Sequence, residues 1–261
     1  ATPTASTSAD GMVGAATQVI ASPYARRVAL LALFATLSLT FTDFVFKSEV
    51  AAAVKPEDLG FFFARVYLIV NVLSLVAQLA LVRPIVRKVS IAGALAVLPV
   101  LLLLGGVGVM AGGGIVAALA LKGSDGALRH SLHRTVTELL YVPMRDRLRT
   151  AAKLFIDVAG QRGGQALASV AILSAVSLEL PTAFYGAAIL LFAGLWIGSA
   201  VTLRRHYLNL FRVTLAEAAE RNHADFPELD VASLESLMAA LNSPNNSEVR
   251  AALQLDRKST R

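Results

Sequence analysis

A run of 31 residues without a charged side chain, residues 91–121, limits most strongly what this chain can fold into. As one straight α-helix it would measure about 46 Å, because each residue rises about 1.5 Å, whereas a bilayer's hydrocarbon core is about 30 Å thick. Two membrane helices need about 40 residues, which is more than the run provides. We therefore expect a turn within the run and a second helix that continues to about His133. The glycines expected to form the turn are Gly105, Gly106, Gly112, Gly113 and Gly114.

The composition of the whole chain is typical of a membrane protein. Hydrophobic residues make up 56% of the 261 residues and charged residues only 16%, which is too apolar for an ordinary soluble domain. The net charge is +6, but the basic residues fall in short clusters between apolar runs, as topology signals do. Aromatic and basic residues do not alternate as they would on a surface that stacks bases, so we expect no nucleic-acid partner.

Apolar segments of membrane-spanning length recur along the chain and predict an all-α, polytopic bundle of six spans over residues 23–206. The expected spans are residues 24–46, 59–82, two helices from the run that starts at residue 91, 152–176 and 182–203. Six spans place nearly all basic clusters on one side of the membrane, as the positive-inside rule requires, whereas five would place half of them on the wrong side. Both ends of the bundle are then cytoplasmic. Between the fourth and fifth spans, residues 135–153 could form an amphipathic surface helix or a plain connector.

Three regions lie outside the expected spans. Residues 1–22 are small and polar and lack the basic segment of a signal peptide, so we expect a flexible linker. Residues 207–255 predict cytoplasmic helices, and the turn SPNN resembles the junction inside a HEAT repeat. A single helix pair cannot bury its apolar face alone, so further repeats and a hairpin docked on the bundle are both open, and such helices could bind a protein partner. Residues 256–261 have no pattern and are interpreted as a non-native tail.

Ionisable residues at membrane depth are the candidate site residues. An ionised side chain near the bilayer centre costs about 2.5 to 3.5 kcal/mol, so such residues usually face an interior cavity and pair with one another. The candidates for a substrate site or pathway are Asp43, Asp125, Arg129, Asp157 and Arg162.

The spacing of these residues predicts ion pairs within single helices. Asp43 and Lys47, Asp125 and Arg129, and Lys153 and Asp157 are each four residues apart, and Lys122 stands three residues before Asp125. Residues three or four apart share a helix face, so each set can partly neutralise itself. Lys47, Lys153 and Arg65 are expected to extend toward water at the membrane surface.

No motif predicts an enzyme, a cofactor or a metal site. The chain has no cysteine, and no Ser/His/Asp set converges on one expected surface. His130 and His133 are three residues apart, but no helical geometry brings Glu138 to the same point. The glycine pattern in GGVGVMAGGG lies in an apolar helix without a preceding strand, so it does not predict a dinucleotide site.

Three strings near the middle of the chain match a pattern found together in one family. They are RHSL at residues 129–132, TELLYVP at 137–143, and KLFID at 153–157 followed by Gly160, Gly163 and Gly164. In these strings the chain resembles the ATP/ADP translocase family of nucleotide transporters, and the resemblance covers roughly residues 24–206. Where the family usually has a Gly-Lys-Ser-Gly-Gly-like string after the aspartate, this chain has QRGG, which retains a cation as Arg162.

The resemblance implies a major-facilitator-like fold, of which these six spans are the C-terminal half, with a missing N-terminal six-span half as partner. It implies membrane transport of an anionic metabolite, here ATP/ADP exchange by alternating access, and a location in the bacterial inner membrane. Arg129 and Arg162 would hold phosphate, while Asp43, Asp125 and Asp157 would set the potential of the cavity or pair with those cations. The open alternative is a non-transporting membrane anchor or sensor for a cytoplasmic helical-repeat scaffold.

Overall fold

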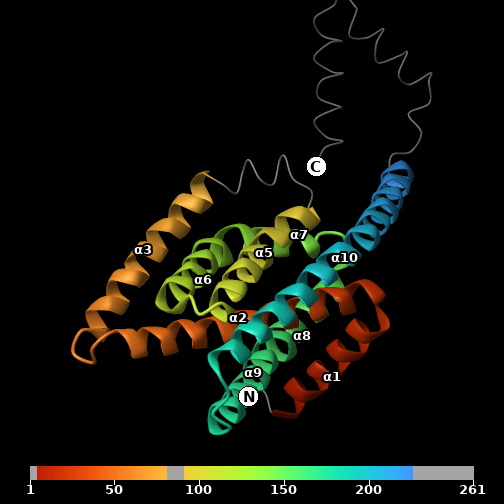
Figure 1. Ribbon diagram of the computed structural model, residues 1–261. Helices are drawn as coiled ribbons and strands as arrows, with labels where there is room; N and C mark the ends of the chain where they lie inside the picture. The colour runs from red at the N-terminus through yellow and green to blue at the C-terminus, as the bar shows by residue number, and fades with distance from the viewer. Residues whose placement is uncertain (1–4, 81–90, 226–261) are drawn as a thin grey trace, which may run out of the picture. The chain divides into compact units, whose positions relative to one another are not determined.

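The computed structural model describes residues 5–80 and 91–225, which contain helices and no strand, so the predicted all-α class is confirmed for this part of the chain (Figure 1). In chain order the elements are α1 (Ala5–Ala21), α2 (Pro23–Ala53), α3 (Leu59–Ala80), α5 (Ile91–Met110), α6 (Gly114–Leu128), the π-helical segment η1 (Arg129–His133), α7 (Arg134–Leu140), α8 (Asp146–Phe155), the π-helical segment η2 (Ile156–Gly163), α9 (Gly164–Ser177) and α10 (Thr182–Asp225).

Four of the described helices are long and apolar enough to cross a membrane. They are α2, α3, α5 over Gly93–Met110, and the first part of α10 over Thr182–Leu203. These segments correspond to four of the predicted spans, and α10 starts at the predicted residue. The long apolar helices fit an integral membrane protein.

The uncharged run breaks at its second group of glycines, as predicted. Helix α5 ends at Met110 and α6 begins at Gly114. Gly112 and Gly114 have φ angles of 79° and 47°, in the left-handed region that a glycine enters without steric cost. The chain can therefore reverse direction within a few residues.

The prediction that Gly105 and Gly106 belong to the turn is wrong, because both lie inside α5, where they allow close packing. A Cβ added to Gly105 would lie 2.5 Å from Leu121 Cδ2 of α6, and one added to Gly106 would lie 3.1 Å from Leu190 Cδ2 of α10. Both neighbouring helices therefore approach the α5 backbone at positions where a larger side chain would collide with them.

The other two predicted spans fall on stretches of helix that are each interrupted by a short π-helical segment. The backbone is helical through α6, η1 and α7, and again through α8, η2 and α9, and each segment exceeds the about 20 residues that a membrane crossing needs. The chain turns between them within residues 141–145. Residues 135–153 are thus divided between α7 and α8 and form no separate surface helix.

The prediction of a flexible linker over residues 1–22 is wrong for Ala5–Ala21, which forms α1. This helix packs along α8 and buries Ala15 and Val19. The contact comes from a segment more than a hundred residues later in the chain, so no local pattern indicates it. Ser22 then caps α2, since its hydroxyl accepts a hydrogen bond from the Ala25 amide at 3.3 Å.

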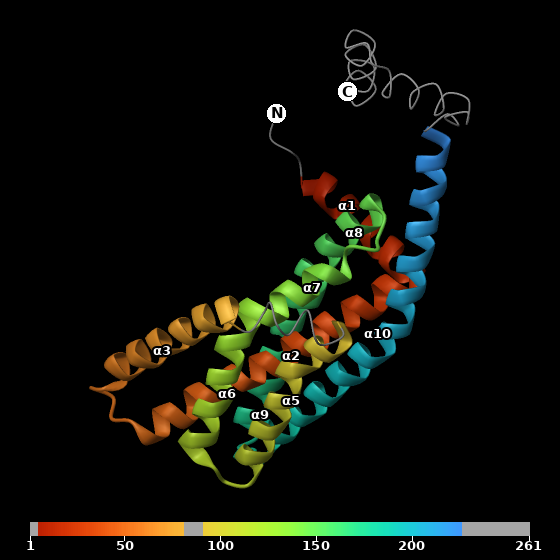
Figure 2. The ribbon, with the colours of Figure 1, turned by 90° about the horizontal axis from the view of Figure 1, so that it is seen from above.

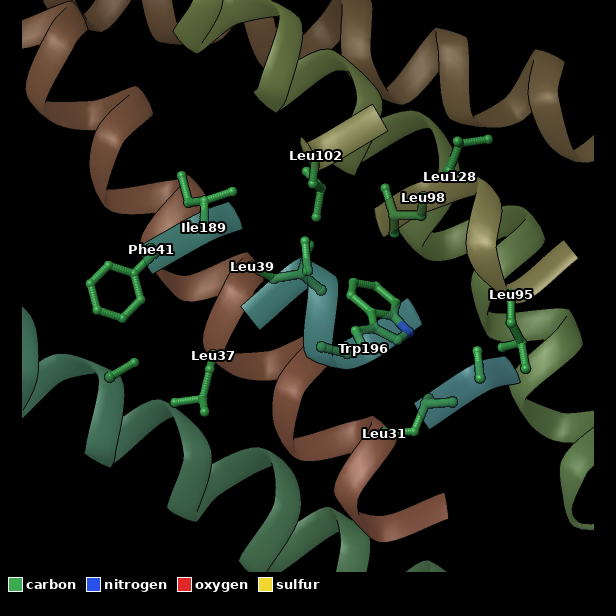
Figure 3. Packing of buried hydrophobic residues seen from close by; sticks show 14 of the residues in the cluster. Leu31, Leu37, Leu39, Phe41, Leu95, Leu98, Leu102, Leu128, Ile189 and Trp196 are labelled. Carbon is green, nitrogen blue, oxygen red and sulfur yellow. The ribbon is translucent and has the colours of Figure 1, made fainter. Parts of the chain in front are cut away.

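Helix α2 lies inside the bundle, in contact with α6, η2 and α9, whereas α3 packs beside α6 on the outside (Figure 2). The apolar core includes Trp196 of α10, which is fully buried. Figure 3 shows this ring among leucines of α2 and α5, including Leu39 and Leu98. The core therefore joins spans that are distant in sequence.

The polar continuation of the last span is helical as far as it is described, because α10 runs on to Asp225. The chain divides into two compact units, residues 1–210 and 211–261. The remainder of the predicted HEAT-like helices, and the tail at 256–261, lie outside the described residues.

Candidate functional site

A groove of about 850 Å³ lies among α2, the η1–α7 segment and the α8–η2–α9 segment. Its polar wall contains residues of all three segments. They are Thr36, Thr40, Asp43, Arg129, His130, His133, Arg134, Thr137, Glu138, Tyr141, Lys153, Asp157, Gln161, Gln165 and Ser169.

Regular spacing places these side chains on the groove. Every fourth residue from Arg129 to Tyr141, and again from Lys153 to Ser169, lines it, and residues at this spacing lie on one helix face. Small residues of α2 leave room between the two faces, and a Cβ added to Gly164 would lie 3.1 Å from Leu33 Cδ1. Helices α9 and α2 therefore approach each other closely at Gly164.

Both walls contain a π-helical segment, η1 on one side and η2 on the other. Such segments are rare inside α-helices and occur frequently at functional sites, because the wider turn redirects side chains.

Five charged residues form an alternating series of ion pairs at one end of the groove. We call Lys47, Asp43, Lys122, Asp125 and Arg129 the ion-pair ladder. Lys47 and Lys122 each place Nζ 2.7 Å from an oxygen of Asp43. Lys122 Nζ also lies 4.0 Å from Asp125, and Arg129 Nε donates to Asp125 Oδ1 at 2.6 Å. The predicted pairs Asp43–Lys47 and Asp125–Arg129 are confirmed, and Lys122 joins them across α6 and α2.

The centre of the ladder is buried. The side chains of Lys122 and Asp125 are 10% and 3% exposed. The Lys122 ammonium lies 5.5 Å from the centre of the Phe46 ring and 5.4 Å from that of Tyr67, distances at which an aromatic face attracts a cation. Lys122 therefore contacts side chains of α2, α3 and its own helix, and this role could not be read from its spacing alone.

A second ion pair lies toward the other end of the groove. Lys153 Nζ is 2.7 Å from Glu138 Oε2 and 5.1 Å from the centre of the Tyr141 ring. The predicted partner of Lys153 was Asp157, but η2 begins between these two residues. Lys153 and Asp157 both line the groove, but the ammonium of Lys153 contacts Glu138 of α7 instead.

The structure brings three of the five predicted site residues to the groove. Asp43, Arg129 and Asp157 line it, and Asp125 is buried where it accepts the hydrogen bond of Arg129. The prediction for Arg162 is not supported by this geometry, because its side chain is exposed and is not part of the groove wall. Gln161, the residue before it, lines the groove instead.

The middle of the groove carries uncharged polar groups that were not among the sequence candidates. His133 Nδ1 and Thr137 Oγ1 are buried without a hydrogen-bond partner in the described part of the chain. Gln161 and Gln165 lie on the opposite segment. His133 and Thr137, like Gln161 and Gln165, are four residues apart, and this spacing of polar residues in an apolar chain is a sequence pattern that could have identified them.

The side chains of the groove wall are suited to binding a polar ligand. Burial, with a smaller effect of nearby Asp157 and Glu138, raises the pKa of Tyr141, so its phenol keeps its proton at neutral pH and can donate a hydrogen bond. Among residues 5–80 and 91–225, no three histidine or carboxylate side chains gather as a metal site requires. The groove thus combines paired charges with neutral donors and acceptors, a set that can bind a polar ligand without covalent chemistry.

Comparisons of the chain with models of protein families, with curated proteins and with solved structures find no match.

Proposed function

We propose that the chain is the C-terminal six-span half of a twelve-span transporter that carries an anionic metabolite by alternating access. ATP/ADP exchange is the activity that the resemblance at residues 129–164 implies. The observation that supports the proposal is the groove itself, which has charged and polar walls although it is built from helices of membrane-spanning length. A polar cavity between such helices is where a transporter binds its substrate.

The six proposed spans comprise the four uninterrupted apolar helices and two further helical segments. These are the α6–η1–α7 segment and the α8–η2–α9 segment, and both form walls of the groove. Irregular or π-helical backbone at membrane depth is tolerated where it lines a cavity, because other groups can then satisfy the backbone. The two interruptions therefore fit a pathway better than they fit a lipid-facing anchor.

The exposed apolar surface provides places for the lipid and for the proposed N-terminal half. Leu68, Val72 and Leu79 of α3 and Leu173 of α9 have most or about half of their surface uncovered. Exposing so many apolar side chains to water would be energetically unfavourable. In a bilayer this surface is covered by lipid chains or by the second six-span half.

Charge within the groove region favours an anion. Asp43 contacts two lysines, and the acidic Asp125 contacts Lys122 and Arg129. Glu138 is paired with Lys153. Most carboxylates of the site are therefore already neutralised, and the Arg129 guanidinium retains further N–H donors for a phosphate or carboxylate of the substrate.

Uptake into liposomes tests the proposal. The full-length natural protein is reconstituted in liposomes loaded with ADP, and entry of labelled ATP is measured. We expect exchange by the wild type and a loss of about tenfold or more for Arg129→Ala, since this variant removes a charge-assisted contact. Arg162→Ala is the matched control, because it removes an arginine outside the groove wall, and it should keep a rate close to wild type.

Three outcomes would count against the proposal in different ways. Absence of uptake of ATP and of other labelled anions by the wild type would favour the membrane anchor or sensor. Uptake that is lost in Arg162→Ala but kept in Arg129→Ala would place the pathway elsewhere. Uptake of another anion but not ATP would keep the transporter and remove the nucleotide.

A further inference from the structure

We infer that the ion-pair ladder sets the charge preference of the groove, with Lys122 and Asp43 as specificity-determining residues. This inference rests on the proposed function, because it concerns the same anion-binding groove. It adds a role for Lys122, which does not line the groove and was not a candidate site residue.

The ladder has an excess of one positive charge. Its order is cation, carboxylate, cation, carboxylate, cation, and each carboxylate lies within 4.0 Å of two cations. The first cation, Lys47, is 57% exposed, so water screens it. The last, Arg129, is 35% exposed and lines the groove. The excess charge is therefore presented to a ligand at Arg129.

Burial makes the middle of the ladder sensitive to the loss of a charge. Lys122 and Asp125 are almost fully covered, and an electrostatic interaction between buried groups is screened much less than one at the surface. If Lys122 loses its charge, Arg129 is the only cation left beside Asp125. The carboxylate of Asp125 then neutralises the charge of Arg129 more completely. If Asp43 loses its charge, Lys122 is released toward Asp125, and Arg129 becomes more available to a ligand.

Two substitutions that each keep about the size of the side chain but remove its charge should therefore change anion binding in opposite directions. Lys122→Met removes the excess positive charge, and Asp43→Asn doubles it. The double variant removes one charge of each sign and restores the original balance. Damage to the packing would instead weaken binding in both single variants and would not be repaired in the double variant.

The experiment measures binding of pyrophosphate to the full-length protein in lipid nanodiscs, with inorganic phosphate as a second probe. We expect Lys122→Met to weaken pyrophosphate binding by about tenfold and Asp43→Asn to strengthen it by about threefold, with the double variant within about threefold of wild type. The less charged phosphate should show the same signs with smaller changes. Lys122→Arg should bind pyrophosphate about as well as the wild type, because it keeps the positive charge.

Controls separate this inference from the proposed function. Arg65→Gln removes an exposed cation of α3 that lies 4.4 Å from the centre of the Phe61 ring, and it should leave binding unchanged. Should Lys122→Met fail to fold, tighter binding by Asp43→Asn still tests the ladder. Binding by the wild type that is weakened in both single variants, or unaffected by either, overturns the ladder inference alone. Absence of binding of either probe by the wild type overturns the inference together with the proposed function.

Discussion

Lys122 Nζ of α6 lies 2.7 Å from Asp43 Oδ1 of α2, although 79 residues separate them in the chain. This contact is the connection between two ion pairs that each form within a single helix. It turns two local pairs into the ion-pair ladder and fixes α6 against α2 at one end of the groove.

The first prediction concerns the stability of this contact. Lys122→Ala leaves Asp125 buried with one cation fewer, and loss of one partner of a buried ion pair costs about 3 to 5 kcal/mol. We expect a clear fall in the Tm of the protein in detergent. Lys47→Ala removes the exposed partner of the same Asp43 and should cost less than about 1 kcal/mol. Equal shifts in Tm for the two variants would contradict this explanation.

The second prediction concerns the packing of α3 against α6. A Cβ added to Gly126 would collide with Val70 Cγ1, whereas one added to Gly123 of the same helix would meet no atom within 4 Å. Gly126→Ala should therefore destabilise the protein by about 1 to 3 kcal/mol, and Gly123→Ala should not. Thermal unfolding measures both.

A compensating substitution provides the control for this packing. Val70→Ala removes the atoms that the new methyl group meets, so the double variant Gly126→Ala/Val70→Ala should regain much of the stability that Gly126→Ala loses. Additive losses in the double variant would show that α3 and α6 do not meet at these two residues.

The third prediction concerns the Glu138–Lys153 pair. The two side chains are 58% and 43% exposed, and an exposed ion pair contributes only about 0 to 1 kcal/mol. Glu138→Gln should change Tm little, but it frees the Lys153 cation in the groove wall. Anion uptake by the full-length protein should therefore change while stability does not. A large loss of stability without a change in uptake would assign the pair to the fold alone.

The fourth prediction concerns Trp196, which is fully buried and whose ring centre lies 5.0 Å from that of His133. Trp196→Ala creates a cavity beside the groove wall, and such truncations cost about 3 to 5 kcal/mol. Trp196→Phe keeps most of the ring volume and should retain most of the stability. Equal Tm values for the two variants would indicate that this core is not tightly packed.

Several features of the fold could be predicted because they depend on local patterns. The break of the uncharged run follows from its length and from glycines that can adopt positive φ at Gly112 and Gly114. The pairs Asp43–Lys47 and Asp125–Arg129 follow from helical spacing. Apolar length likewise indicated α2, α3, α5 and the first part of α10.

Other features could not be predicted because they depend on contacts between distant segments. Helix α1 is rich in small residues, and its packing on α8 involves residues far along the chain. Lys153 pairs with Glu138 of another helix, and Gln161 lines the groove where Arg162 does not.

The helical class, the apolar segments and the pairs of charges that share one turn follow from the amino-acid order alone, because hydrophobic length and helical spacing are local properties. Which charges meet across helices and which of them face the groove depends on how the helices pack. An ion pair such as Lys122–Asp43 depends on the packing of α6 against α2. That packing is fixed by the shapes of many side chains together, and no short stretch of the chain contains it.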